Sequence, residues 1–190
     1  MLNDRAIREA LVRSLINKKN RPQRIIHELS VSNGNAIADV VAIYRESHCF
    51  EIKGEGDKIE RLKTQGEYYN AAFRKITLVT TEKHGKKALK HTPSFWGIII
   101  AKESAGKIIL NYLRKALSNP FFDKKTAVQT LWKEEMLGIL SEMEIFIKKR
   151  DMPRENIGFI LAEEMGKKEL SEKISSALIL RQSSFIKHVS

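Results

Sequence analysis

The chain has 190 residues, of which 42% are hydrophobic and 30% charged, a composition typical of one folded domain with or without an appendage. No apolar run approaches the roughly 18–20 residues that cross a bilayer, and the first residues lack the apolar stretch of a secretory signal. The single cysteine, Cys49, excludes an internal disulfide and a multi-cysteine zinc site. We therefore expect a cytoplasmic protein with no membrane partner.

The formal net charge is +11 and the isoelectric point about 9.7. A basic domain attracts polyanions, because each neutralised phosphate releases condensed counterions. The charge therefore favours a nucleic-acid partner, although a merely basic surface explains it as well.

Apolar residues recur at helical spacing over residues 4–17, and Asn3 is placed to cap that helix. Residues 25–29 are too short to distinguish a helical turn from a strand. Residues 36–44 are apolar on both faces, as in a strand inside a covered sheet. After a polar turn, residues 49–53 form the expected antiparallel partner of that strand.

The next segments predict a helix over residues 58–73, capped by Asp57, and then a β-branched strand over residues 75–81. A short helix over residues 83–91, stopped before Pro93, follows. Residues 96–102 and 107–110 then form the expected final hairpin. Beyond residue 111 the pattern changes to three helical stretches, over residues 126–149, 154–165 and 169–182. The sequence thus predicts an α/β domain over residues 1–110 and a helical extension over residues 111–190.

One charged residue, Asp39, interrupts the apolar strand 36–44, and the next strand carries Glu51 and Lys53. Glu51 and Lys53 are two residues apart, so their side chains leave the same face of the strand. A hairpin between the two strands brings Asp39 beside them, and three charges then meet on an apolar sheet.

Burying these charges separately is costly, and two carboxylates in apolar surroundings suit a divalent cation such as Mg²⁺ or Mn²⁺. A lysine beside them can orient an attacking water and stabilise charge on a phosphate. The alternative is a pair of salt bridges on an edge strand with no metal.

The triplets Ile37-Ala38-Asp39 and Glu51-Ile52-Lys53, in helix–strand–strand–helix order, resemble the PD-(D/E)XK nuclease superfamily over roughly residues 4–102. The literal proline before the first aspartate is absent. The resemblance implies a restriction-endonuclease-like core, a mixed central sheet flanked by helices. It further implies that Asp39, Glu51 and the main-chain carbonyl of Ile52 bind Mg²⁺ and that Lys53 assists catalysis.

Gln65 and Tyr69, four residues apart on one helical face, resemble the Gln-x-x-x-Tyr motif of the branch related to the RecB nuclease domain and phage exonucleases. The resemblance implies that Gln65 contacts the catalytic centre or a phosphate of the cleaved strand. Tyr69 is then a contact to the DNA backbone, or an ordinary aromatic residue that packs on the sheet.

The stretch Glu51 to Gln65 also resembles a small group of uncharacterised bacterial and phage proteins of this superfamily, in which an aspartate and an Arg-Leu pair precede the glutamine. Asp57 and Arg61 match by position, and Lys58 and Arg61 are further candidate contacts to nucleic acid. A helix cap and an i,i+4 ion pair are the structural alternative for Asp57 and Arg61.

Superfamily members often add a glutamate from the first helix to the metal site. Glu9 is one candidate, although the helical periodicity turns it away from the apolar stripe. Glu28, just before the first hairpin, is the slightly favoured alternative, and simple exposure to solvent explains either residue.

Together these features predict a Mg²⁺-dependent nuclease, an endonuclease or exonuclease, that hydrolyses phosphodiester bonds, most readily in DNA. The alternative from another class is a non-catalytic protein that keeps the fold and binds nucleic acid or recruits a partner. The helices after residue 111 offer a surface for a homodimer or a protein partner.

Overall fold

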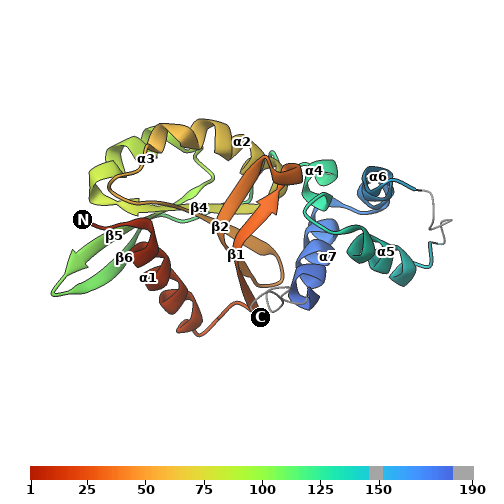
Figure 1. Cartoon of the computed structure of the whole chain (residues 1–190), viewed down its shortest axis with the longest axis horizontal. Coiled ribbons are helices and arrows are strands. Elements are labelled where there is room, and N and C mark those ends of the chain that lie inside the picture. The colour runs from red at the N-terminus through yellow and green to blue at the C-terminus, as the bar shows by residue number, and fades with distance from the viewer. Residues whose placement is uncertain (146–151, 182–190) are drawn as a thin grey trace, which may run out of the picture.

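A mixed six-stranded sheet forms the centre of the protein in the computed structural model, which describes residues 1–145 and 152–181 (Figure 1). The strands follow one another across the sheet in chain order: β1 (Arg24–Val31), β2 (Ala36–Ile43), β3 (Ser47–Lys53), β4 (Lys75–Thr81), β5 (Gly97–Ser104) and β6 (Lys107–Arg114). β3, β4 and β5 pair in parallel, while β1–β2, β2–β3 and β5–β6 are antiparallel. The predicted α/β class is confirmed.

Helices cover both faces of this sheet. α1 (Asp4–Ile16) buries Ile7, Leu11 and Leu15 against one face, and the Asn3 side chain caps it by accepting from the Ala6 N–H at 2.9 Å. α2 (Leu62–Ala72) and α3 (Gly85–His91) cover the opposite face (Figure 1). The two faces therefore have separate apolar clusters, one under α1 and one under α2.

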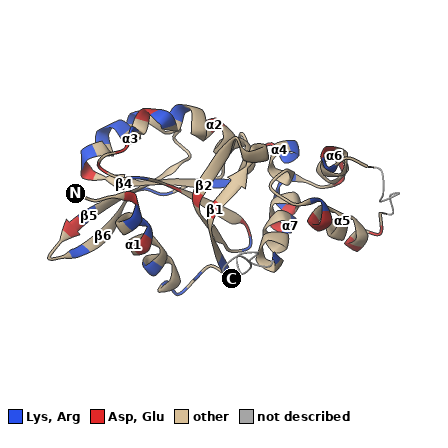
Figure 2. Cartoon of the chain, in the orientation of Figure 1, with Lys and Arg blue, Asp and Glu red and all other residues tan. Residues whose placement is uncertain are grey.

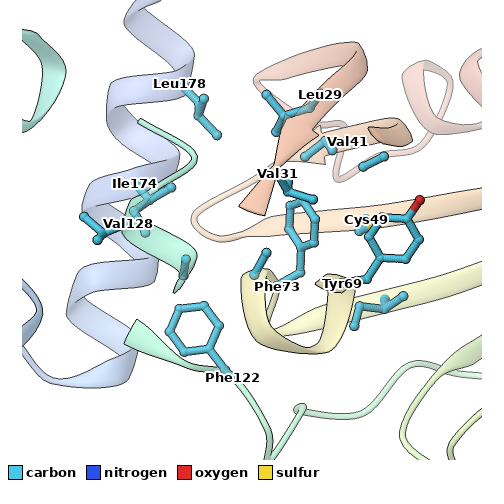
Figure 3. Packing of buried hydrophobic residues seen from close by; sticks show 14 of the residues in the cluster. Leu29, Val31, Val41, Cys49, Tyr69, Phe73, Phe122, Val128, Ile174 and Leu178 are labelled. Carbon is cyan, nitrogen blue, oxygen red and sulfur yellow. The ribbon is translucent and has the colours of Figure 1, made fainter. Parts of the chain in front are cut away.

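The helices after β6 share the second of these clusters. They are α4 (Lys124–Val128), α5 (Lys133–Glu142), α6 (Arg154–Glu164) and α7 (Lys167–Leu180). Figure 3 shows Ile174 and Leu178 of α7 on the side of Leu29 and Val31 of β1, in one continuous cluster. The tail therefore completes the core of the sheet, and the boundary expected at residue 110 falls inside β6.

Three local expectations change in the structure. The helix expected over residues 58–73 begins at Leu62 after a 3-10 turn (Ile59–Arg61), and the Asp57 carboxylate accepts from the Gly54 N–H at 2.7 Å. The stretch expected as one helix over residues 126–149 contains two, because Glu135 accepts from the Trp132 N–H at 2.7 Å and starts a new helix there. Residues 146–149 and 182 of the expected helices lie outside the described residues.

Residues 25–29, open between turn and strand, belong to β1, and both expected hairpins are confirmed. The hairpin of β2 and β3 is the one that carries Asp39, Glu51 and Lys53. Within residues 1–145 and 152–181, every helix is too short or too polar to pass through a bilayer.

Candidate catalytic centre

β2 and β3 separate at Asp39. Their ladder runs from the Ile43–Ser47 pair to the Val40–Phe50 pair, and the Asp39 carboxylate then takes the next donor, the Ile52 N–H, at 2.7 Å. A buried backbone N–H requires a partner, and here a carboxylate replaces the neighbouring strand as that partner. Asp39 is thereby held beside the segment that carries Glu51 and Lys53.

Glu51 is 1% exposed, inside the sheet, because β3 continues to pair with β4 beyond the point where β2 leaves it. Glu51 Oε1 accepts from Lys53 Nζ at 2.6 Å, and Glu51 Oε2 is buried without a hydrogen-bond partner among the described residues. The Lys53 carbonyl accepts from Thr80 Oγ1 at 2.8 Å, which fixes the end of β3 against β4. Glu51 thus has one paired oxygen and one oxygen without a hydrogen-bond partner among the described residues.

Burial disfavours ionisation of both carboxyl groups. Burial, followed by the nearby Asp39 charge, raises the pKa of Glu51 to about 7 against the opposing effects of Lys53 and of the nearby Tyr69 hydroxyl. Burial likewise raises the pKa of Asp39 against the stabilising Ile52 N–H. Perturbed carboxyl groups of this kind concentrate at functional sites, because catalytic groups need pKa values matched to their task.

Arg8 of α1 is part of this centre, although the sequence reasoning missed it. Its guanidinium contacts Asp39 Oδ1 at 3.3 Å, Glu28 Oε1 at 3.4 Å and Asp4 Oδ1 at 3.2 Å. The only signal in the sequence is the i,i+4 spacing of Asp4 and Arg8, which is common on helices. The contact with Asp39 depends on how α1 docks on the sheet.

Gly54 allows that docking, because the start of α1 crosses the end of β3 at this residue. A Cβ atom on Gly54 would lie 3.0 Å from both the Asp4 nitrogen and the Leu2 oxygen, and the Glu55 N–H donates to that Leu2 oxygen at 2.9 Å. Only a glycine permits this backbone approach without a shift. The crossing places Arg8 over the gap between β2 and β3.

Of the two glutamates considered for the metal site, Glu28 is the one tied to Asp39. Glu28 has a φ of 56°, uncommon for a residue other than glycine, and the β1–β2 ladder passes from the His27–Val40 pair to the Leu29–Ala38 pair. Glu28 and Asp39 are thus both skipped by the ladder, and Arg8 bridges their carboxylates. Glu9 is exposed and pairs with Arg5 at 3.1 Å.

Tyr69 and Gln65 occupy different environments despite their shared helix face. Tyr69 is fully buried, where nucleic acid does not reach it, and its hydroxyl donates to the Ile37 carbonyl at 2.8 Å. This burial fits the packing alternative for Tyr69, which ties α2 to β2. Gln65 is partly buried, and its Oε1 atom has no hydrogen-bond partner among the described residues.

Positive charge is distributed over both layers, as Figure 2 shows for Lys and Arg on α1, α3 and α4. Lys58 and Arg61, the other candidate contacts to nucleic acid, are exposed on the segment that leads into α2.

Over residues 1–145 and 152–181, no three His, Cys, Asp or Glu side chains are arranged to hold a metal ion. The metal ligands expected from the sequence, Asp39, Glu51 and the Ile52 carbonyl with Glu28 or Glu9, stay a prediction.

A protein family described as Bacteriophage P4 protein cII matches the chain over residues 1–189, which include both the sheet and the helices after it. Protein cII of Enterobacteria phage P4 is 24% identical over 146 residues, which are 76% of this chain and 55% of that protein. The chain thus spans about half the length of this curated relative. A solved structure, a protein of unknown function from Silicibacter pomeroyi, is similar with 15% identity and a TM-score of 0.47, over 74% of this chain and 91% of that one.

Proposed function

The chain belongs to the bacteriophage P4 protein cII family, and we propose that it is a metal-dependent nuclease with a restriction-endonuclease-like core. Its substrate is DNA and its place of action the cytoplasm. The observation that carries the proposal is Glu51, a buried carboxylate whose pKa is raised to about 7 and whose Oε2 atom has no hydrogen-bond partner within residues 1–145 and 152–181. Asp39 and Lys53 lie beside it, one on the other strand of the hairpin and one at 2.6 Å.

The donor set fits Mg²⁺ or Mn²⁺, since both prefer carboxylate and carbonyl oxygens. Glu51 Oε2 is available, and the Asp39 carboxylate and Ile52 carbonyl complete the ligands from the protein. A divalent ion bound there supplies charge neutralisation at the phosphate and a more acidic water.

Other side chains near the metal site have separate roles in cleavage and in DNA binding. Lys53 Nζ donates to the attacking water or to a phosphate oxygen and so stabilises the charge that develops during cleavage. Gln65 Oε1, which has no hydrogen-bond partner in the part of the chain that the structure describes, orients the water or the cleaved strand. Lys58 and Arg61, exposed before α2, hold the DNA backbone.

One observation favours a non-catalytic alternative. Arg8 and Lys53 already pair with Asp39 and Glu51, so the four charges balance without a metal. A protein that binds nucleic acid through the same fold without cutting it has no need for further cations at this site.

The deciding experiment incubates linear, circular and single-stranded DNA with the wild-type protein in Mg²⁺, in Mn²⁺ and in EDTA. We expect cleavage that requires metal and disappears in Asp39→Ala, and the substrate pattern separates endonuclease from exonuclease. Glu60→Gln is a matched control, because Glu60 is an exposed acid paired with Lys87 on the surface. DNA binding without cleavage in any metal, unchanged by Asp39→Ala, would establish the non-catalytic alternative.

Arg8 provides an independent prediction about the metal. Its guanidinium engages Asp39 Oδ1 and adds positive charge to the site, so it opposes a bound cation by both contact and Coulomb repulsion. We expect Arg8→Gln to bind Mn²⁺ several-fold more tightly than wild type in calorimetric titration. Arg5→Gln, on the same helix, removes an equal charge that pairs with Glu9 and should leave Mn²⁺ affinity unchanged. Weaker Mn²⁺ binding by Arg8→Gln would show instead that Arg8 holds Asp39 in its binding position.

A further inference from the structure

A cavity of about 520 Å³ lies at the end of the sheet opposite the candidate catalytic centre. It is lined by the end of α1 and the residues after it, the turn after β2, the beginnings of β3 and β4, and the outer strand β6, chiefly through Leu15, Lys18, Tyr44, His48, Lys75 and Tyr112. Its volume is in the range of sites that bind small molecules.

This cavity lies on the other face of the sheet from Glu51 and Lys53, as well as at the other end of β3. Side chains alternate along a strand, so His48 and Phe50 leave one face of β3 while Glu51 and Lys53 leave the other. Phe50 packs in the apolar cluster under α1, whereas Cys49, on the face of Glu51, packs in the cluster under α2. A ligand in the cavity is therefore not the phosphate at the catalytic centre.

Flat, uncharged rings form much of the cavity lining. His48 stacks on Phe50 with ring centroids 4.3 Å apart and an interplanar angle of 22°. Burial, aided by Lys75 and Lys18, lowers the pKa of His48 to about 3, so the ring is neutral at physiological pH. Tyr44 lines the same cavity, and Tyr112, from β6, is 52% exposed. Aromatic surfaces of this kind stack on nucleobases.

Two lysines supply the positive charge. Lys18 Nζ donates to the Tyr112 hydroxyl at 2.6 Å and lies 5.1 Å from the centroid of that ring. Lys75, at the start of β4, is exposed beside it. Arg45 and Glu46 also line the cavity, and each is paired with an oppositely charged residue outside it, Arg45 with Glu172 and Glu46 with Arg74. The cavity thus presents ammonium groups next to aromatic rings.

We infer that this cavity binds a phosphorylated nucleoside, with the base stacked against Tyr112 and Tyr44 and the phosphate held by Lys18 and Lys75. The ligand is either a free nucleotide or an unpaired nucleotide of a single strand, which share this chemistry. The inference does not depend on phosphodiester cleavage.

The test measures binding of adenosine monophosphate and of a short single-stranded oligonucleotide in EDTA, where metal-dependent cleavage is absent. We expect adenosine monophosphate to bind, and Lys18→Ala and Tyr112→Leu each to weaken its binding by about tenfold, the usual scale of one lost stacking or phosphate contact. Lys107→Ala and Leu113→Ala are matched controls, because both residues are exposed on β6 and neither lines the cavity.

Competition between the two probes identifies the source of the ligand. If adenosine monophosphate displaces the oligonucleotide, the cavity accepts a nucleotide of a strand, and if only adenosine monophosphate responds to the variants, it accepts free nucleotides. Absence of saturable binding of either probe, or equal losses in the control variants, would overturn the inference. Because no variant touches Asp39, Glu51 or Lys53, cleavage activity in Mg²⁺ reports separately on the proposed nuclease.

Discussion

Replacing Lys53 by methionine is expected to lower DNA cleavage by about two to three orders of magnitude, the usual loss when one group that stabilises transition-state charge is removed. Methionine keeps much of the apolar stem of the side chain and removes only the ammonium group. The group lies 2.6 Å from Glu51 Oε1, so its loss takes positive charge away from the carboxylates without removing a metal ligand.

The Lys53→Met variant should therefore still bind Mn²⁺, whereas Glu51→Gln should lose both Mn²⁺ binding and cleavage. Calorimetric titration with Mn²⁺ and a cleavage assay on the same preparations separate the two roles. Lys87→Met is the control, since Lys87 is exposed and pairs only with Glu60 among the described residues. Full cleavage by Lys53→Met would remove this residue from the proposed mechanism.

The second large effect concerns stability without metal. The pKa of Glu51 is raised from 4.5 to about 7 in the folded protein. Below the unfolded pKa the group is protonated in both states, so its contribution to stability is fully present there. As pH rises from the unfolded pKa through the folded pKa, the Glu51 carboxyl ionises in the unfolded chain before it ionises in the folded protein. The contribution of this group to the free energy of unfolding is lost over that range.

The shift corresponds to about 3 kcal/mol of unfolding free energy, lost between about pH 4 and about pH 8 in EDTA. Urea denaturation of wild type and Glu51→Gln across this range isolates the effect as the difference between the two slopes. The raised pKa of Asp39 contributes in the same direction in both proteins. Parallel pH dependences of the two proteins would show that Glu51 is not a buried carboxyl of this kind.

Added Mn²⁺ should reverse this trend, because a metal binds the ionised carboxylate and stabilises only the folded state. The Mn²⁺-induced rise in the unfolding temperature of wild type should therefore grow with pH and be absent in Glu51→Gln. A rise of equal size in both proteins would place the metal elsewhere.

The local elements near the centre were predictable from short-range patterns. A short run that is apolar on both faces predicted β2, and the polar turn after it predicted the β2–β3 hairpin, because a strand inside a covered sheet buries both of its faces. The alternation of side chains along a strand placed Glu51 and Lys53 on one face, and the lone charge in an apolar strand singled out Asp39. Each of these inferences spans only a few residues of chain.

The boundary between two consecutive helices was harder to predict from the sequence. The break between α4 and α5 depends on the hydrogen bond from the Trp132 N–H to Glu135, and apolar spacing continues across it. The burial of Tyr69 was also beyond the sequence pattern. Helical spacing showed which face of the helix Tyr69 is on, but its complete burial comes from packing against β2 and Trp96.

By itself, the sequence determined the strands after β1, the β2–β3 hairpin and the placing of Glu51 and Lys53 on one face near Asp39, because all of these follow from patterns over neighbouring residues. Only the tertiary structure decided that Arg8 joins these three residues, that Glu28 rather than Glu9 is tied to Asp39, and that the tail helices complete the core. These features depend on the docking of whole helices on the sheet, as at Gly54, and such contacts join residues far apart in the chain with no periodic signal.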